Sequence, residues 1–234
     1  MKRFTLIELL VVIATMAVLI SLLLPALSKA RLKTKVGVCL SQSRQIGTAA
    51  LVYATENNGR FPVYQNDAGL NDGFRWVGKG GTASPEITRG GFQAVEKRAL
   101  NKYLGYTSND SEVPLALCPL KDNRQGLNQQ GGTFSQEAHL GSSYTGAVRW
   151  DYDDLGENTI SQIQNSSTMA MVLTFSAFIT IKYGTSGHYK ATWNHSDVGR
   201  YPITFVDGHT SHLTLIKGTG LQHSMDMVTF RNNY

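Results

Sequence analysis

A run of nineteen residues without a charge, from Leu9 to Leu27, constrains this chain more than any other feature. As an α-helix, such a run is about 28 Å long, close to the ~30 Å thickness of the hydrocarbon core of a bilayer. Its place near the N-terminus predicts either a membrane-spanning helix or a secretory signal peptide. Both alternatives argue against a wholly cytosolic enzyme.

The positive charge of the chain is concentrated before the globular part begins. Residues 1–57 hold seven Lys and Arg against two Glu, whereas residues 58–234 hold fifteen basic and fifteen acidic residues. Because the larger part has no net charge with which to neutralise phosphates, we expect no nucleic-acid partner. The cations at Lys29, Arg31, Lys33 and Lys35 instead mark the end of the membrane segment.

Two features argue against a cleaved secretory signal. The apolar stretch 4–27 is longer than the usual ~7–15 residues, and Glu8 lies within it. A carboxylate costs about 2.5–3.5 kcal/mol toward the centre of a bilayer, and somewhat less near the interface. An acid in that position indicates a functional group with a partner, and a monomeric anchor would have no use for it.

The residues Phe4-Thr5-Leu6-Ile7-Glu8-Leu9-Leu10 resemble the class III signal of type IV prepilins and type II secretion pseudopilins. In that family a prepilin peptidase cuts before the Phe and methylates the new amine. The resemblance implies processing between Arg3 and Phe4, with residues 1–3 as the leader. It also implies that Glu8 pairs with the N-terminus of a neighbouring subunit during assembly, and that Pro25 bends the helix. Arg3 stands where the family usually has Gly.

Other segments extend this resemblance over most of the chain. Cys39–Gly47, Tyr53–Pro62, Cys118-Pro119 and Ser142–Tyr144 are similar to segments of a large pseudopilin-like subfamily. That subfamily carries a His followed nine residues later by Asp-Gly, a processing-associated motif of unknown role. Here eleven residues separate His195 from Asp207-Gly208, so the imperfect match supports membership and no mechanism.

A helical pattern continues past Pro25 to about Asn57. Apolar residues recur at helical spacing at Leu32, Val36, Cys39, Ile46, Ala50 and Tyr53. We predict one helix over residues 4–57, kinked at Pro25. Its first half, 4–27, would serve membrane insertion and assembly, and its amphipathic second half, 28–57, would pack on a globular head.

The head, residues 58–234, is predicted to be rich in strands. Runs of Val, Ile, Thr, Tyr and Phe lie at 143–150, 169–175, 178–183, 189–193, 203–206 and 212–216. A helix is predicted over 91–105 and a helical turn over 159–164, whereas 58–90 and 109–132 have the composition of loops. The order of helix first and antiparallel strands after it predicts an α+β fold of pilin-like type.

Cys39 and Cys118 are the only cysteines, and an even pair in an exported domain is a disulfide candidate. The bond would close about 78 residues of chain and contribute about 3–4 kcal/mol in the chain-entropy model. The alternative is two buried thiols, because Cys39 lies on the apolar stripe.

The late histidines raise the question of a metal site. His209 and His212 lie three apart in a predicted strand and so point to opposite faces, which disfavours a shared metal. Asp207-Gly208 is typical of a hairpin turn. Major pseudopilins hold a structural calcium near their C-terminal strands, but no run of oxygen ligands appears here, and we expect no cofactor.

No sequence motif indicates an enzyme. The chain lacks G-x-S-x-G, H-E-x-x-H and both glycine-rich phosphate motifs. Five aromatic residues could instead stack on sugars or pack in the core: Tyr64, Phe74, Trp76, Trp150 and Trp193.

Two functional hypotheses remain. The first is a structural subunit that polymerises through its N-terminal helix into a type IV pilus-like or type II secretion pseudopilus filament. The resemblance then implies as partners copies of the chain, a prepilin peptidase, the inner-membrane assembly platform and minor pseudopilins. The second is a membrane-anchored module whose head binds a polysaccharide or another envelope partner.

The two lines of evidence on orientation disagree. Lysine and arginine counts favour the side of residues 29–35 as cytoplasmic. The resemblance implies the reverse: a single-pass protein of the inner membrane with an extracytoplasmic head, and a filament in the periplasm or at the cell surface. We adopt the second orientation, because an even cysteine pair suits an exported head.

Overall fold

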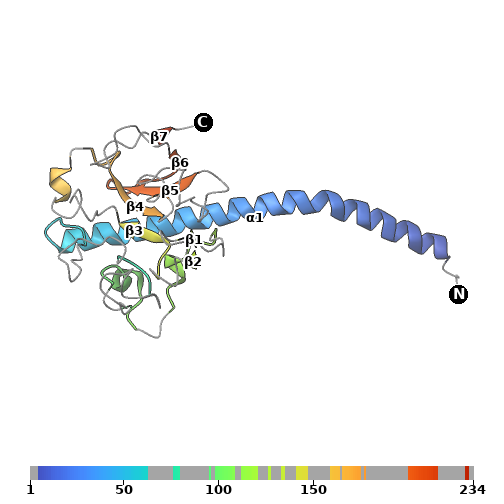
Figure 1. The fold of residues 1–234 in the computed structure, drawn as a ribbon, viewed down its shortest axis with the longest axis horizontal. Coiled ribbons are helices and arrows are strands. Elements are labelled where there is room, and N and C mark those ends of the chain that lie inside the picture. The colour runs from blue at the N-terminus through green and yellow to red at the C-terminus, as the bar shows by residue number, and fades with distance from the viewer. Residues whose placement is uncertain are drawn as a thin grey trace.

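The fold is α+β, as predicted, and consists of one long helix and an antiparallel sheet (Figure 1). The structure is a computed structural model that describes residues 5–62, 76–79, 95, 98–108, 112–120, 126–127, 133–134, 141–146, 159–163, 165–174, 177, 200–215 and 230–231. The strands predicted at 178–183 and 189–193 lie outside these ranges.

Helix α1 runs from Leu6 to Glu56, close to the predicted limits of 4 and 57. Its 51 residues make it about 76 Å long. It ends where Asn58 and Gly59 adopt left-handed backbone angles (φ 55° and 77°), and the Gly59 N–H donates back to the Ala54 carbonyl at 2.8 Å. The helix continues through Pro25 without a break, as predicted, and Figure 1 shows that it curves gently along its length.

The two halves of α1 differ in what surrounds them. Every residue from 5 to 35 is exposed, and we call this segment the free half. From Val36, the first half-buried residue, to Glu56 the helix packs on the head, and we call this segment the packed half. Packing therefore begins later than the predicted boundary at residue 28, and Leu32, assigned to the packing stripe, is 43% exposed.

The main sheet has the strand order β3-β4-β5-β6-β7, with every neighbouring pair antiparallel. Its strands are β3 (Tyr144–Gly146), β4 (Ala170–Thr174), β5 (Tyr201–Phe205), β6 (Thr210–Leu215) and β7 (Phe230–Arg231). Four of them overlap predicted strand runs, with β5 and β6 each beginning two residues earlier than predicted, and β7 was not predicted. A separate antiparallel pair, β1 (Gly126–Leu127) with β2 (Thr133–Phe134), begins inside a segment predicted as loop.

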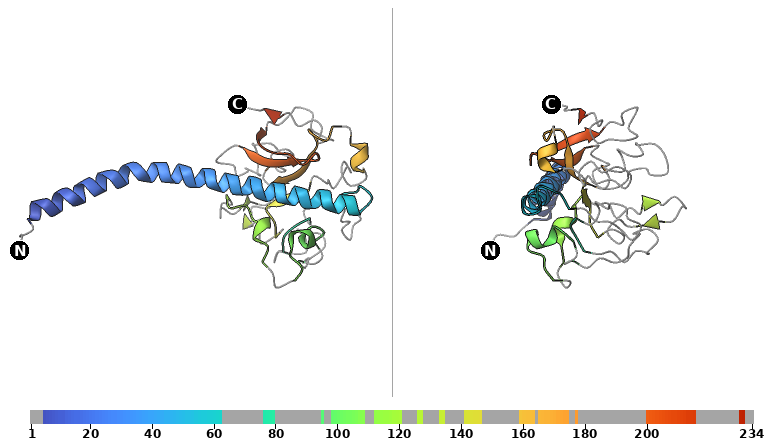
Figure 2. Two further views of the ribbon diagram at one scale, coloured as in Figure 1. Left: turned by 180° about the vertical axis from the view of Figure 1, so that it is seen from behind. Right: turned by 90° about the vertical axis from the view of Figure 1, so that its left-hand side faces the viewer.

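The packed half lies against β4, β5 and β6 on one side and against the 3-10 helix η3 (Asn101–Leu104) on the other, as Figures 1 and 2 show. Apart from Ile46, the residues that the helix buries in the head are small: Cys39, Ser43, Gly47, Ala49, Ala50 and Ala54. At Gly47 an added Cβ would lie 2.5 Å from Cγ2 of Thr204 on β5. The absence of a side chain at Gly47 is therefore what lets the helix approach the sheet so closely.

The helix predicted over 91–105 is wrong in its described part. That part forms turns and η3, which ends at Gly105 (φ 84°), the predicted stop. Asn101 supplies the reason. Its buried amide donates to the carbonyls of Gly78 and Val95 at 2.7 Å each, and its Oδ1 accepts from the Gly78 N–H at 2.9 Å. These side-chain bonds fix a local turn in competition with regular helix.

Two further 3-10 helices complete the described elements. Helix η4 (Pro114–Ala116) lies beside Cys118, and η5 (Ile160–Gln162) confirms the turn predicted at 159–164.

Candidate functional site

The free half of α1 presents a continuous apolar surface. Its large aliphatic side chains between Leu6 and Leu27 are 48–80% exposed. The helix is long and apolar enough to cross a membrane, and nothing in the described chain covers this segment. Soluble proteins rarely leave so large an apolar surface in water, so lipid or other protein chains must cover it.

The hydroxyl groups within this apolar segment are satisfied by its own backbone. Thr15 donates to the Val12 carbonyl at 2.8 Å and Ser21 to the Val18 carbonyl at 2.7 Å. Such bonds let a hydroxyl enter hydrocarbon without an unsatisfied donor. Glu8 is the one ionisable side chain in the sequence between Thr5 and Leu27.

Glu8 closes a capping box at the start of α1. Its Oε2 accepts from the Thr5 backbone N–H at 2.8 Å and from the Thr5 hydroxyl at 2.7 Å, and the Glu8 N–H donates to that hydroxyl at 3.3 Å. These bonds satisfy donors that every helix N-terminus leaves open. The expectation that Glu8 has no use in a single chain is therefore wrong.

Pro25 lies in the last turns of the apolar segment, where the hydroxyl of Ser28 donates to its carbonyl at 2.9 Å. Proline has no N–H to donate to the residue four positions earlier, Ser21. One helical bond is thus missing within a helix that otherwise continues on both sides. Missing helical bonds of this kind allow a helix to bend.

A covalent and polar junction fixes the helix where it enters the head. Cys39 and Cys118 form a disulfide with a Cα–Cα distance of 5.4 Å, and both residues are fully buried. One turn further along the helix, Gln42 donates to the carbonyls of Pro114 and Leu117 at 3.2 Å each. Tyr144 on β3 donates to Gln42 Oε1 at 2.9 Å and contacts the Cys39 carbonyl at 3.2 Å.

Tyr144 belongs to this junction as a neutral phenol. Burial raises its pKa far above the ordinary value, so it stays a hydrogen-bond donor at all physiological pH values. Deeper in the head, the hydroxyls of Ser43 and Thr204 lie 2.9 Å apart, and Thr204 makes a second 2.9 Å bond to Thr210. The packed half is thus held to both sides of the head.

The Asp207-Gly208 pair forms the predicted turn, between β5 and β6. The Gly208 N–H donates to the Phe205 carbonyl at 2.9 Å, and Gly208 has φ 87°. The Phe205 N–H donates to the His209 carbonyl at 2.9 Å, which makes the loop three residues long. The left-handed residue here is the glycine and not Asp207, so this is a turn with a bulge and not a two-residue turn.

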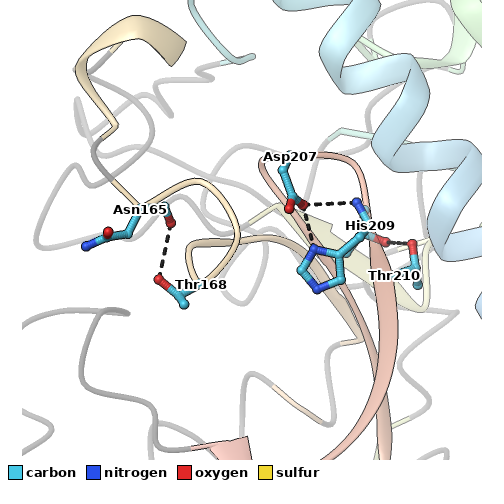
Figure 3. A network of polar contacts seen from close by, with 6 residues as sticks. Asn165, Thr168, Asp207, His209 and Thr210 are labelled. Carbon is cyan, nitrogen blue, oxygen red and sulfur yellow. Dashed lines mark hydrogen bonds and ion pairs between the residues drawn. The ribbon is translucent and has the colours of Figure 1, made fainter.

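His209 is held beside this turn by Asp207 (Figure 3). Asp207 Oδ1 lies 2.6 Å from His209 Nδ1 and accepts from the His209 backbone N–H at 3.0 Å, while the imidazole stacks on Phe205 at 4.3 Å between ring centroids. Burial raises the pKa of Asp207, but the hydrogen bonds and charge of His209 outweigh it and leave that pKa below its ordinary value. The Asp207 N–H donates to the Ser166 carbonyl at 3.1 Å, within the Asn165–Thr168 turn shown in Figure 3.

The described residues contain no group of three or more His, Cys, Asp and Glu that could hold a metal ion. His212 contacts the Arg200 carbonyl at 3.0 Å, and burial lowers its pKa. It therefore has a different partner from His209. Trp76 is buried, donates to the Pro62 carbonyl at 2.9 Å and stacks on Phe61, so it is a core residue and not a sugar platform.

Several predicted site residues lie outside the described residues: Arg3, Phe4, His195, Tyr64, Phe74, Trp150 and Trp193. Two features of the site were missed from the sequence. The capping box had a readable signal, because Thr followed three residues later by Glu before an apolar run is its signature. The Gln42–Tyr144 junction had none, since it joins positions about 100 residues apart.

The chain matches no protein-family model, no curated protein and no solved structure. Its functional interpretation consequently depends on the residues and contacts described above.

Proposed function

We propose that this protein is a structural subunit of a helical filament, of the type IV pilus or type II secretion pseudopilus kind. The observation that carries the proposal is a single unbroken helix whose free half is apolar and uncovered while its packed half is built into the head. Before assembly, the free half would anchor the subunit in the membrane. During assembly, the same surface would be buried against neighbouring helices.

The first argument is the rigidity of the connection. A protein that needs only an anchor can join it to its head by any flexible linker. Here no linker separates the two, and the disulfide with the Gln42–Tyr144 contacts fixes the helix where it enters the head. The position of one free half therefore determines the position of its head, which is what a regular filament requires.

The second argument is that the hydrogen bonds of Glu8 within its own chain leave its charge without a positive partner. Within one chain its carboxylate is bonded to Thr5, so the isolated subunit tolerates the charge. Hydrogen bonds alone leave that charge uncompensated in hydrocarbon, where a positive group on a neighbouring chain would stabilise it. The candidate is the positive N-terminus of the next subunit. This is the amine of Phe4 after cleavage by a prepilin peptidase, or the amine of Met1 with Lys2 or Arg3 without cleavage.

The proposed life cycle follows from this arrangement. A single-pass protein of the inner membrane, with its head outside the cytoplasm, would be taken up by an assembly platform together with minor pseudopilins. The filament would stand in the periplasm or at the cell surface. The buried disulfide suits an oxidising compartment and supports this orientation of the head.

Isolation of filaments from the cells that make this protein tests the proposal. Filaments sheared from the surface, or released from the periplasm, should contain this chain as their main component, and mass spectrometry should find a methylated Phe4 at its N-terminus if processing occurs. A chain found only as a monomer in the membrane would contradict the proposal and favour an anchored binding module.

A further inference from the structure

Four cations form a collar on the free half, directly after its apolar segment. The collar consists of Lys29, Arg31, Lys33 and Lys35, and all four residues are exposed. The sequence has no acidic residue between Glu8 and Glu56, so α1 itself offers the collar no counter-charge. We propose that the collar binds the anionic headgroups of phospholipids and so fixes the depth of the helix in the membrane.

The spacing along the helix places the collar in the headgroup layer. Leu6 to Leu27 is about 32 Å, which fills a ~30 Å hydrocarbon core. The collar then lies about 3–12 Å beyond the edge of the core. The headgroup layer on each side is roughly 5–8 Å thick, and lysine and arginine side chains are long enough to reach back into it.

The described part of the head leaves this layer free. The first fully buried residue, Cys39, lies about 18 Å beyond Leu27 along the helix. The described head packs only on residues from Val36 onward. Headgroups can therefore surround the collar without displacing any contact of the described head.

The arrangement of the four charges around the helix favours lipid over a second protein surface. At about 100° per residue, Lys29 and Lys33 lie on one face, and Arg31 with Lys35 on the opposite face. An acidic patch on another copy of the chain would meet one face and two charges. A layer of headgroups encircles the helix and meets all four, each attracted to an anionic surface.

The proposal rests on the membrane anchoring that is part of the proposed function, and it holds for either orientation of the head. It is tested with the full chain in phosphatidylcholine vesicles that contain a trace of nitroxide-labelled phosphatidylglycerol or phosphatidylcholine. Electron spin resonance separates lipid immobilised at the protein from bulk lipid and gives the relative association of the two. We expect phosphatidylglycerol to associate more strongly, and the preference to fall at 1 M salt, where the Debye length is about 3 Å.

Variants assign the preference to the collar. The fourfold change Lys29→Gln, Arg31→Gln, Lys33→Gln and Lys35→Gln should abolish it. Two double variants each remove the charges of one face: Lys29→Gln with Lys33→Gln, and Arg31→Gln with Lys35→Gln. Each should halve the logarithm of the ratio of phosphatidylglycerol to phosphatidylcholine association, because both faces meet headgroups. The control Arg44→Gln with Lys102→Gln removes two exposed charges farther along the chain and should leave it unchanged.

The outcomes are distinguishable. Equal association of the two lipids, or a preference that survives in the fourfold variant, would overturn the lipid proposal while leaving the filament intact. Loss of filaments in the fourfold variant without any lipid preference in the wild type would assign the collar to a protein contact. A spectrum with no immobilised lipid at all would overturn membrane anchoring, and with it both proposals.

Discussion

The two halves of α1 show that apolarity and packing are separate properties of a helix. The free half holds the large aliphatic residues and touches nothing in the described chain, whereas the packed half buries Ser43, Gly47 and Ala50. Large side chains suit a surface that lipid or many neighbours will cover. Small ones let a helix backbone approach a sheet. One continuous helix thus combines an uncovered apolar surface with a segment built into the core of the head.

Removal of the apolar segment of the free half gives the largest expected effect on this comparison. A chain lacking residues 1–27 should be soluble and monomeric, because the exposed apolar surface is deleted while the packed half and its contacts remain. Sedimentation of the truncated and full chains without detergent measures the difference. Filaments formed by the truncated chain would show that the head alone drives assembly.

Loss of the disulfide, which ties the packed half to the head, should have the second-largest effect, a decrease in the free energy of unfolding. The two cysteines are 79 residues apart, and closing a loop of that length is worth about 4.5 kcal/mol in the chain-entropy model. Cys39→Ser with Cys118→Ser should lower the free energy of unfolding by about that amount in urea titrations. In the wild type, alkylation of the unfolded protein should label neither cysteine before reduction and both after it. Labelling before reduction would remove the cross-link from the account.

Two glycines of the same helix provide a matched pair. Replacement of Gly47 by Ala places a methyl group against Thr204, whose hydroxyl is held by Ser43 and Thr210, so that side chain cannot rotate away freely. We expect a net loss of about 1–2 kcal/mol in the free energy of unfolding. Gly37 has no other atom within 4 Å of an added Cβ, so Gly37→Ala should be neutral or stabilise by up to about 1 kcal/mol.

Thermal unfolding of both variants in the same detergent measures this contrast. Equal effects at the two positions would mean that the close approach of helix and sheet at Gly47 is absent in solution.

The turn at Asp207 should matter least. Asp207→Ala removes the acceptor of the His209 N–H and should cost about 0.5–1 kcal/mol in urea unfolding, whereas Asp207→Asn keeps an acceptor and should cost less. Because the pKa of Asp207 is lowered in the fold, its charge contributes stability above about pH 4, and this is lost as the pH falls through the folded-state pKa. The difference between wild type and Asp207→Asn should therefore shrink as the pH falls below about 4. A constant difference would mean that the charge of Asp207 is not involved.

The extent to which the sequence predicted this structure depends on the range of each interaction. The limits of α1, the stop at Gly59 and the turn at Gly208 follow from local residues, and all were predictable. The start of packing was misplaced because Leu32 has the right spacing but no sheet beneath it, while Ser43 and Gly47 pack without being large. Strand β7 has two residues, too few for a pattern, and Asn101 stops a helix through bonds to distant backbone.

The candidate site divides in the same way. The apolar segment, Glu8 and the cysteine pair were readable as residue types. The bond between Glu8 and Thr5 was also readable, from the Thr-x-x-Glu signature, whereas the contacts of Gln42 required the fold. Processing at Phe4 and the role of His195 stay predictions.

Substitution of Glu8 is the most direct test of filament assembly. The structure lets its role in helix capping be separated from the proposed pairing of its charge with a neighbouring subunit. Gln keeps the capping box but removes the charge, and Leu removes both. Filament yield is measured against membrane-fraction abundance for Glu8→Gln, Glu8→Leu and Glu8→Asp. The account predicts normal abundance of all three in the membrane, loss of filaments for Gln and Leu, and a smaller loss for Asp. Normal filaments from Glu8→Gln would contradict charge pairing between subunits and leave helix capping and apolar packing as the causes of assembly.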